Sequence, residues 1–233
     1  ARRTGAPRFF RRGAQAPFTP SEREAVYKAI FARRDVRRFV STPVPAEAVE
    51  RILLAAHHAP SVGFMQPWNF IVIRDPRTRK SIKQAFLSAR SQEADRFSDD
   101  RKKLYLGLKL EGIEEAPLNI CVTCDSTRHG PAVLGRSLMP ETDIYSTCCA
   151  IQNLWLAARA EGLGVGWVSI LSEERLKRML HIPAHITVVG YLCVGYPARF
   201  ETKPELETIG WLNRLPLRDV VLNEAWDGIA AAD

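Results

Sequence analysis

Two short, almost wholly apolar runs constrain the fold of this chain more than any other feature. They are residues 118–124 (Leu-Asn-Ile-Cys-Val-Thr-Cys) and residues 186–194 (Ile-Thr-Val-Val-Gly-Tyr-Leu-Cys-Val). Continuous apolar runs of this length, rich in β-branched residues, are typical of strands buried on both faces. We therefore predict two buried strands, the second of them central in its sheet.

Helical patterns surround these strands. The first predicted helix has Thr19 as its N-cap, Pro20 at the first helical position and Glu22 completing a capping box. Its apolar stripe would comprise Ala25, Val26, Ala29 and Ile30. Further helices are predicted at residues 46–57, 76–90, 143–161 and 173–180, further strands at 69–74 and 164–171, and a mobile helical segment at 91–110. The chain is irregular after residue 196. This pattern predicts a mixed α/β or α+β domain, with several strands in one sheet and helices covering it.

The charge of the chain is unevenly distributed. The 233 residues carry a formal net charge of +7, and five arginines lie within the first twelve residues. We interpret residues 1–17 as a flexible basic tail, although such a tail could also touch nucleic acid or an anionic membrane. No apolar run approaches the ~20 residues of a membrane helix, and no signal peptide is evident. We therefore expect a cytoplasmic protein with no nucleic-acid or membrane partner.

The cysteines and histidines do not indicate a disulfide framework or a metal site. The five cysteines are an odd number in a chain of ordinary size. Cys121 and Cys124 resemble a redox pair, but residues three apart on a strand point to opposite faces. The histidines lack zinc-ligand spacing. We expect structural cysteines and no metal.

A glycine-rich run, Gly162-Leu-Gly164-Val-Gly166, invites a dinucleotide-binding interpretation. That motif follows a strand and opens a helix, whereas these glycines follow a predicted helix and open a strand. The run instead indicates a tight turn and a close approach of the main chain to a ligand or a neighbouring element.

The cluster Arg33-Arg34-Asp35-Val36-Arg37 is the strongest candidate for a binding site. Guanidinium groups match the geometry of phosphate oxygens, and several converge at the end of a capped helix. By itself the cluster could equally be a solvated basic surface.

Other motifs accompany this cluster along nearly the whole chain. They are residues 59–61 (Ala-Pro-Ser), 66–72 (Gln-Pro-Trp-Asn-Phe-Ile-Val), 164–167 (Gly-Val-Gly-Trp) and 195–199 (Gly-Tyr-Pro-Ala-Arg). In this order the motifs resemble the nitroreductase-like FMN flavoproteins. Residues 59–70, 108–113, 120–125 and 164–170 are similar, more closely, to the 5,6-dimethylbenzimidazole synthases of that superfamily. The chain departs from ordinary nitroreductases at Phe64, where they commonly carry Asn, and at Asp35, where they often carry Ser.

The resemblance implies a nitroreductase-like α+β fold, with helices covering a central mixed sheet, that forms an intertwined homodimer with FMN at the subunit interface. Residues 18–200 would be the FMN-binding domain, and residues 201–233 an arm that packs on the domain or on the partner subunit. By position in the motifs, the residues implied to contact FMN are Arg33, Arg34, Asp35, Val36, Arg37, Ser61, Met65, Leu106, Gly166, Ser169 and Arg199.

The resemblance also implies a reaction. Reduced FMN, supplied by a separate flavin reductase, would be consumed with dioxygen, through a peroxyflavin, to give 5,6-dimethylbenzimidazole and erythrose 4-phosphate. Asp35 would be the general acid/base and Ser169 would assist, both as catalytic residues, because the chemistry needs proton transfer in a closed, dry pocket. Residues 104–109, which include Leu106, would form a lid.

Three alternatives remain at this stage. The chain could be an NAD(P)H-dependent FMN nitroreductase or flavin reductase, a flavin-storage protein, or a nucleic-acid binder that acts through its basic tail.

Overall fold

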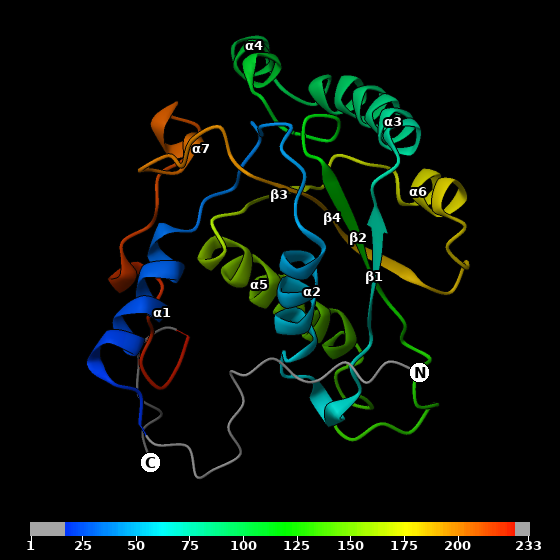
Figure 1. The fold of residues 1–233 in the computed structure, drawn as a ribbon, viewed down its shortest axis with the longest axis vertical. Coiled ribbons are helices and arrows are strands. Elements are labelled where there is room, and N and C mark those ends of the chain that lie inside the picture. The colour runs from blue at the N-terminus through cyan, green and yellow to red at the C-terminus, as the bar shows by residue number, and fades with distance from the viewer. Residues whose placement is uncertain (1–16, 227–233) are drawn as a thin grey trace.

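The computed structural model describes residues 17–226, so most of the expected basic tail lies outside the described residues. A four-stranded sheet forms the centre of the fold (Figure 1), with β1 at Trp68–Ile73, β2 at Leu118–Cys124, β3 at Gly164–Val168 and β4 at Thr187–Gly195. The strand order is β1-β2-β4-β3, and every neighbouring pair is antiparallel. The expected mixed character is confined to one isolated parallel bridge, between Asp35 and Val165. The fold is therefore α+β, as predicted.

Helices cover both faces of the sheet. On one face α2 (Ala46–His57) and α5 (Thr142–Ala160) pack on the strands, with Ile52, Ile151 and Leu154 fully buried. On the other face lie α3 (Pro76–Ala94) and α6 (Glu173–Leu180), which contribute Ile82, Phe86 and Leu176 to a second core. Burial of large aliphatic and aromatic side chains on both faces accounts for the continuous apolar character of β2 and β4.

Most predicted elements are confirmed with small changes at their ends. The helix α1 (Pro20–Ala32) has Thr19 as N-cap with both hydrogen bonds of the capping box. The strand at 118–124 has the predicted bounds, and β4 is central. The predicted strand at 164–171 ends early, at Val168. The 91–110 segment divides into the end of α3 and a separate helix, α4 (Asp99–Gly107).

The predicted apolar stripe of α1 does not face the core of this chain. No residue of α1 is buried, and Val26 and Ile30 are exposed. The rings of Tyr27 and Phe31 stack on each other with centroids 5.8 Å apart, and Phe31 is 70% exposed. An amphipathic helix whose apolar residues find no core needs another surface to cover them.

The chain after β4 is largely irregular, as expected, and is interrupted by α7 (Glu205–Thr208) and by a short 3-10 turn at Leu217–Asp219. Another 3-10 turn, at Val62–Phe64, precedes β1. Cys121 and Cys124 lie on β2 as free, buried thiols. Within residues 17–226, no helix combines the length and apolar character needed to cross a membrane. The same residues include no cluster of His, Cys, Asp and Glu suited to a metal ion.

Candidate functional site

Residues 33–38, called here the arginine segment, run along the free edge of β3. The backbone N–H of Val36 donates to the carbonyl of Val165 at 3.0 Å, and Asp35 forms the parallel bridge to the same residue. Farther along, the N–H of Ala198 donates to the carbonyl of Arg38 at 3.0 Å. Main-chain hydrogen bonds therefore hold the segment to β3 at Val36 and to the chain that follows β4 at Arg38.

Two glycines of β3 make this close approach possible. A Cβ on Gly166 would lie 2.1 Å from the carbonyl oxygen of Val36, and one on Gly164 would lie 2.7 Å from the Val36 side chain. The glycine-rich run thus brings a neighbouring element close, as one of its two interpretations predicted. Val36 itself is buried between them.

The C-terminal half of α5 holds the start of the arginine segment. The indole Nε1 of Trp155 donates to the carbonyl of Arg34 at 3.3 Å, and Nε of Arg159 donates to the carbonyl of Ala32 at 3.2 Å. The guanidinium of Arg33 lies 4.7 Å from the centroid of the Trp155 ring. This cation–π contact directs Arg33 along the helix surface.

Asp35 is held at both carboxylate oxygens. Oδ1 accepts the backbone N–H of Trp167 at 3.0 Å, and Oδ2 forms an ion pair with Arg37. Burial is the largest influence on this carboxyl and raises its pKa, although Arg37, the Trp167 N–H and Arg33 each lower it. Asp35 therefore keeps its proton to a higher pH than an ordinary aspartate, which suits an acid/base group.

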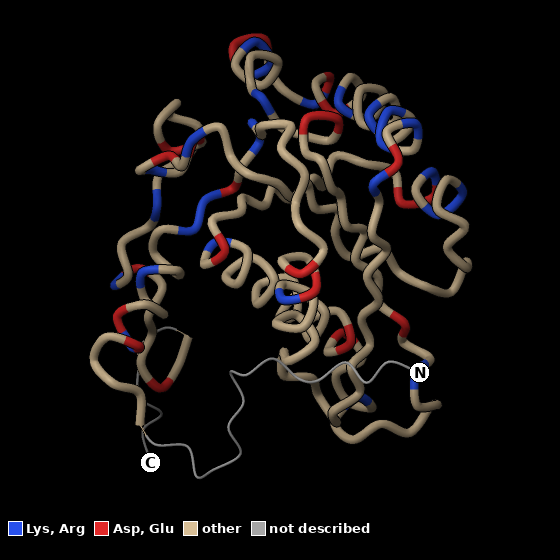
Figure 2. The backbone as a smooth tube through the Cα atoms, viewed as in Figure 1, with Lys and Arg blue, Asp and Glu red and all other residues tan. Residues whose placement is uncertain are grey.

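A cavity of about 280 Å³ opens beside the segment. The residues that line it are Arg34, Asp35, Val36, Arg37, Arg38, Ala198, Arg199, Glu201 and Glu205. Four arginines and three acids therefore share one hollow. Figure 2 shows this basic stretch after α1, with the acidic positions of α7 near it. Such a cavity can accept an anion that replaces the internal carboxylates.

Two of these arginines retain unused donors. The Nε atoms of Arg34 and Arg37 are buried and have no hydrogen-bond partner among the described residues. The terminal nitrogens of Arg34 donate to the carbonyls of Phe31, Arg33 and Thr202. Buried donors without partners are uncommon in folded proteins and call for an explanation such as an absent ion, although the Nε atoms of Arg79 and Arg90 share this feature away from the cavity. The four arginines of the cavity thus suit an anionic group such as a phosphate.

Predicted contact residues that lie outside the arginine cavity on this chain include Ser61, Met65, Leu106 and Ser169. Ser61 and Met65 belong to the loop before β1, where the Ser61 hydroxyl accepts the N–H of Gln66 at 3.1 Å and Met65 is fully buried. This loop contacts Ser146, near the start of α5, whereas Arg33 contacts Trp155. Ser146 and Trp155 are nine positions apart on α5, so the two contacts lie roughly 13 Å apart along the helix axis. The arginine cavity does not include the loop.

Leu106 and Ser169 also lie outside the arginine cavity. Leu106 lies on α4 and its side chain is exposed. At the C-terminal end of this helix, the carbonyls of Leu106 and Leu108 accept hydrogen bonds from Arg90 of α3. Ser169 follows β3 and lines a smaller hollow together with Trp167. The main-chain N–H of Trp167 is the one that donates to Asp35. Arg199, by contrast, lines the arginine cavity, with its guanidinium paired to Glu201.

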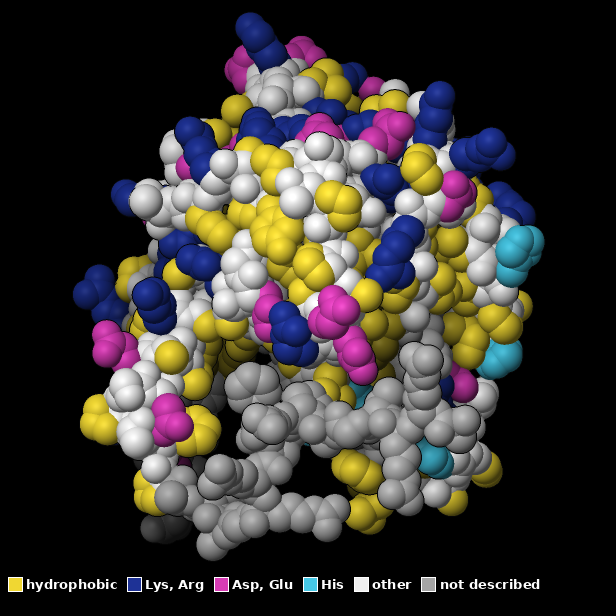
Figure 3. All heavy atoms as spheres, in the orientation of Figure 1, with side chains coloured by type: hydrophobic (Ala, Val, Ile, Leu, Met, Phe, Trp, Pro, Cys, Tyr) yellow, Lys and Arg dark blue, Asp and Glu magenta, His cyan; other side chains and the backbone are white. Residues whose placement is uncertain are grey.

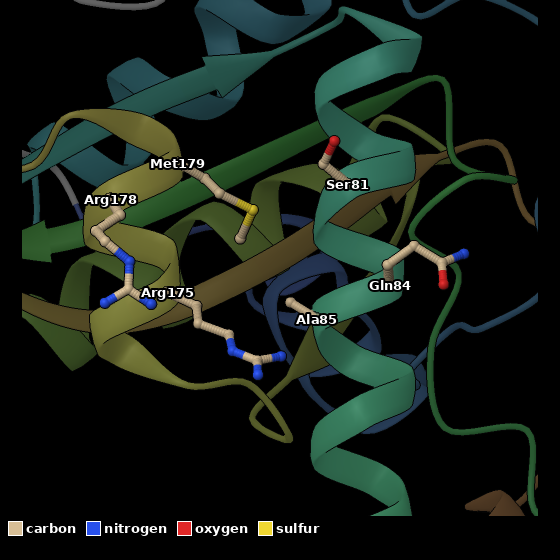
Figure 4. Close-up of a pocket in the computed structure, with 6 residues that line it drawn as sticks. All are labelled: Ser81, Gln84, Ala85, Arg175, Arg178 and Met179. Carbon is tan, nitrogen blue, oxygen red and sulfur yellow. The ribbon is translucent and has the colours of Figure 1, made fainter.

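Another hollow, between α3 and α6, is not associated with the predicted site. Ser81, Gln84, Arg175 and Met179 are among its lining residues, and Figure 4 shows Arg175 extending from α6 toward α3 while Arg178 stays beside α6. Arg178 there is paired with Glu174 on the same helix. None of the predicted contact residues lines this hollow.

Four residues of the arginine cavity were not among the predicted contacts: Arg38, Ala198, Glu201 and Glu205. Arg38 continues the basic run that begins at Arg33 and could have been named as a contact from its position alone. Glu201 and Glu205 come from the irregular C-terminal segment, where neither periodicity nor a motif marks them. Glu205 pairs with Arg38 at 3.1 Å and lies 3.9 Å from Arg37.

Known proteins resemble this chain in sequence and in fold. The sequence model of the Nitroreductase family matches residues 30–196. A 5,6-dimethylbenzimidazole synthase of Rhodospirillum rubrum is 43% identical over 199 residues, covering 85% of this chain and 94% of that protein. A 5,6-dimethylbenzimidazole synthase of Rhodobacter capsulatus is 37% identical over 202 residues, covering 85% of this chain and 96% of the relative.

A solved structure agrees in fold at lower sequence identity. Oxidised iodotyrosine deiodinase, bound to FMN and 3-iodo-L-tyrosine, superposes with a TM-score of 0.66 at 21% identity. The match covers 83% of this chain and 97% of that one. At this identity the likeness shows the fold alone.

The contact between β3 and the arginine segment can be tested with Gly166→Ala. The new Cβ would meet the Val36 carbonyl, so the segment must shift, and we expect the free energy of unfolding to fall by about 2 kcal/mol, as for overpacked cores. Affinity for oxidised FMN should fall with it. Urea denaturation and flavin titration measure the two effects. Gly107→Ala is the stability control, because a Cβ added there would meet no atom of the described residues within 4 Å; equal stability of the two variants would contradict the packing described.

Proposed function

Because the chain belongs to the Nitroreductase family, we propose that it is a 5,6-dimethylbenzimidazole synthase that fragments reduced FMN with dioxygen. The identity of 43% over 85% of the chain to a synthase of that name is the observation that carries this proposal. Reduced FMN would be the substrate, and a separate flavin reductase would supply it. FMN provides both the electrons for dioxygen and the carbon skeleton of the benzimidazole.

The arginine cavity would hold the phosphate of FMN. Arg37 and Arg34 offer buried Nε donors, and Arg199 faces the same hollow from the other side. A phosphate dianion that accepts from several guanidinium groups gains charge-assisted hydrogen bonds in a partly desolvated setting. Arg33 lies against Trp155 beside this group and adds positive potential.

Asp35 would move the proton that the fragmentation requires. Its carboxylate lines the cavity that holds the phosphate, so it lies near the ribityl chain of a flavin bound there. Burial and a raised pKa make it a better base than an exposed aspartate. The Trp167 N–H and Arg37 fix its orientation, and Ser169, beside Trp167, would assist from the end of β3.

The helix α4 would exclude solvent from the flavin, with Leu106 turned toward it. Arg90 holds the C-terminal end of α4, and the Tyr105 hydroxyl donates to Glu93 of α3 at 2.7 Å. Leu104 and Leu106 remain exposed, so they are available to cover an apolar ring system.

A second copy of this chain would complete the site. Exposed apolar side chains are numerous on α1, at residues 134–145 and on the C-terminal segment, and some are visible among charged side chains on the α1 side of the molecule in Figure 3. They include Phe18, Tyr27, Phe31, Leu212, Leu215, Leu217, Val220, Val221, Leu222 and Trp226. An apolar surface this extensive is typical of an obligate interface. In such a dimer, Ser61 and Met65 of one subunit would approach the flavin held by the arginines of the other.

The aerobic reaction tests the proposed activity. Incubation with chemically reduced FMN in air should give 5,6-dimethylbenzimidazole and erythrose 4-phosphate, measured by chromatography and mass spectrometry. Asp35→Asn should retain flavin binding and lose at least roughly a hundredfold in product formation, as for loss of a general base. Full recovery of oxidised FMN from the wild-type reaction would reject the synthase, and nicotinamide-driven turnover with intact FMN would favour the nitroreductase alternative.

The pH dependence of the rate tests the role of Asp35. As a base it acts when ionised, so the rate should rise as pH increases through the pKa of Asp35. Burial raises that pKa, so the rise should lie above the range of an ordinary aspartate. Arg37 lowers the pKa, so Arg37→Gln should move the rise to still higher pH at saturating flavin. Initial rates from acid to neutral pH measure this; identical profiles for the two proteins would contradict it.

The proposed dimer is tested by Phe31→Lys. A charge on the exposed face of α1 should weaken association, because burying an unpaired ammonium in an apolar interface is costly. Sedimentation should show twice the mass of one chain for the wild type and a shift to single chains for the variant. Leu87→Lys, at a partly exposed position on α3, is the control and should remain dimeric. A monomeric wild type would refute the dimer.

A further inference from the structure

The arginine cavity contains its own anions. Its four arginines are matched by three acids, and each acid has an arginine partner: Asp35 pairs with Arg37, Glu201 with Arg199, and Glu205 with Arg38 and Arg37. A phosphate that enters must compete with these carboxylates for the same guanidinium groups. The three acids differ in how easily a phosphate could displace them from their arginine partners.

Glu205 is the acid most able to leave. Asp35 is fixed by the Trp167 N–H and by its bridge to Val165. Glu201 pairs with Arg199 two residues away, and that arginine side chain is largely exposed. Glu205 instead reaches the arginine segment from α7, a helix of four residues with no side-chain cap. A single short helix is weakly held by its own hydrogen bonds.

Glu205 and Trp211 belong to one hydrogen-bonded unit. The N–H of Ile209 donates to the carbonyl of Glu205 at 3.1 Å, and the N–H of Trp211 donates to the carbonyl of Leu206 at 2.9 Å. A movement of Glu205 that includes its main chain would therefore be shared by a unit that extends to Trp211. We call residues 205–211 the α7 unit.

Trp211 connects the α7 unit to α4. Its ring meets the ring of Phe97 edge-on, with centroids 5.7 Å apart, and the guanidinium of Arg101 lies 4.5 Å from its centroid. Ile209 lines a hollow together with Leu104 and Leu108. The α7 unit thus contacts the start of α4 through Trp211 and shares a hollow with the end of α4, which Arg90 and Glu93 hold to α3.

We propose that Glu205 is an internal stand-in for phosphate: it occupies Arg37 and Arg38 in the empty site, and its displacement by a phosphate monoester frees the α7 unit and, through Trp211, the helix α4. Glu205 is thus a positioning residue that acts through the arginines. The proposal rests on the assignment of the arginine cavity to the phosphate of FMN. Under this proposal, α4 moves only when a phosphate is bound in the arginine cavity.

Inorganic phosphate is the probe, because it fills the arginine cavity without covering α4. Glu205→Gln removes the competing charge, so we expect phosphate to bind roughly threefold to fivefold more tightly by calorimetry, within the range of partly exposed ion pairs. Glu207→Gln makes the same charge change on the same helix, away from the lining of the cavity, and should alter the affinity less than about twofold. Glu205→Asp, which retains a carboxylate, should bind phosphate nearly as the wild type does.

Hydrogen exchange of α4 tests the connection. In the wild type, saturating phosphate should speed amide exchange of residues 99–107 and 205–211 by roughly threefold or more, since local opening follows the loss of contacts. Glu205→Gln should show this faster exchange without phosphate, and phosphate should then add little. Glu207→Gln should respond to phosphate as the wild type does.

Three results would overturn the proposal: Glu205→Gln binding phosphate no more tightly than Glu207→Gln, phosphate binding that leaves α4 exchange unchanged, or no phosphate binding by the wild type. None of these measurements uses the reaction. Absence of benzimidazole product would therefore reject the synthase and leave the stand-in intact, and the converse result would do the opposite.

Discussion

The pairing of the arginine segment with the free edge of β3 is the constraint on which the site depends. One main-chain hydrogen bond, from Val36 to Val165, and the absence of a side chain at Gly166 bring the segment against the sheet. Because alternate residues of an extended segment point to opposite sides, Val36 enters the core while Asp35 and Arg37 turn toward the cavity. The main-chain pairing with β3 thus fixes the directions in which the charged side chains of the arginine segment point.

That arrangement joins binding and chemistry in one stretch of chain. Arg37 is shared between Asp35, Glu205 and, in the proposed complex, the phosphate. Its position affects the pKa of Asp35 as well as the affinity of the cavity. A substrate that is consumed must be held while its own skeleton breaks. In the proposed complex, a base within the segment that holds the phosphate would keep a constant relation to the end of the molecule that does not react.

Sequence reasoning recovered the parts that depend on local pattern. The strand at 118–124 followed from its apolar run, the start of α1 from its capping box, and the turn at Gly162 from glycine's access to positive φ. Glu201 and Glu205 could not be predicted as residues of the cavity, because they are far from Arg37 along the chain and lie in a segment without periodicity. The exposure of α1 was also missed, since an apolar stripe does not reveal whether its own chain or another covers it. In the proposed dimer, the placement of Ser61 and Met65 relative to the flavin would depend on that second chain in the same way.

A crystal structure of the chain with oxidised FMN tests the central claim most directly. The account predicts that the phosphate of FMN lies among Arg34, Arg37 and Arg199, with the Asp35 carboxylate facing the ribityl chain and the side chain of Glu205 moved away from Arg37. A phosphate bound elsewhere, for example between α3 and α6, or a flavin whose ribityl chain lies beyond the reach of Asp35, would contradict it.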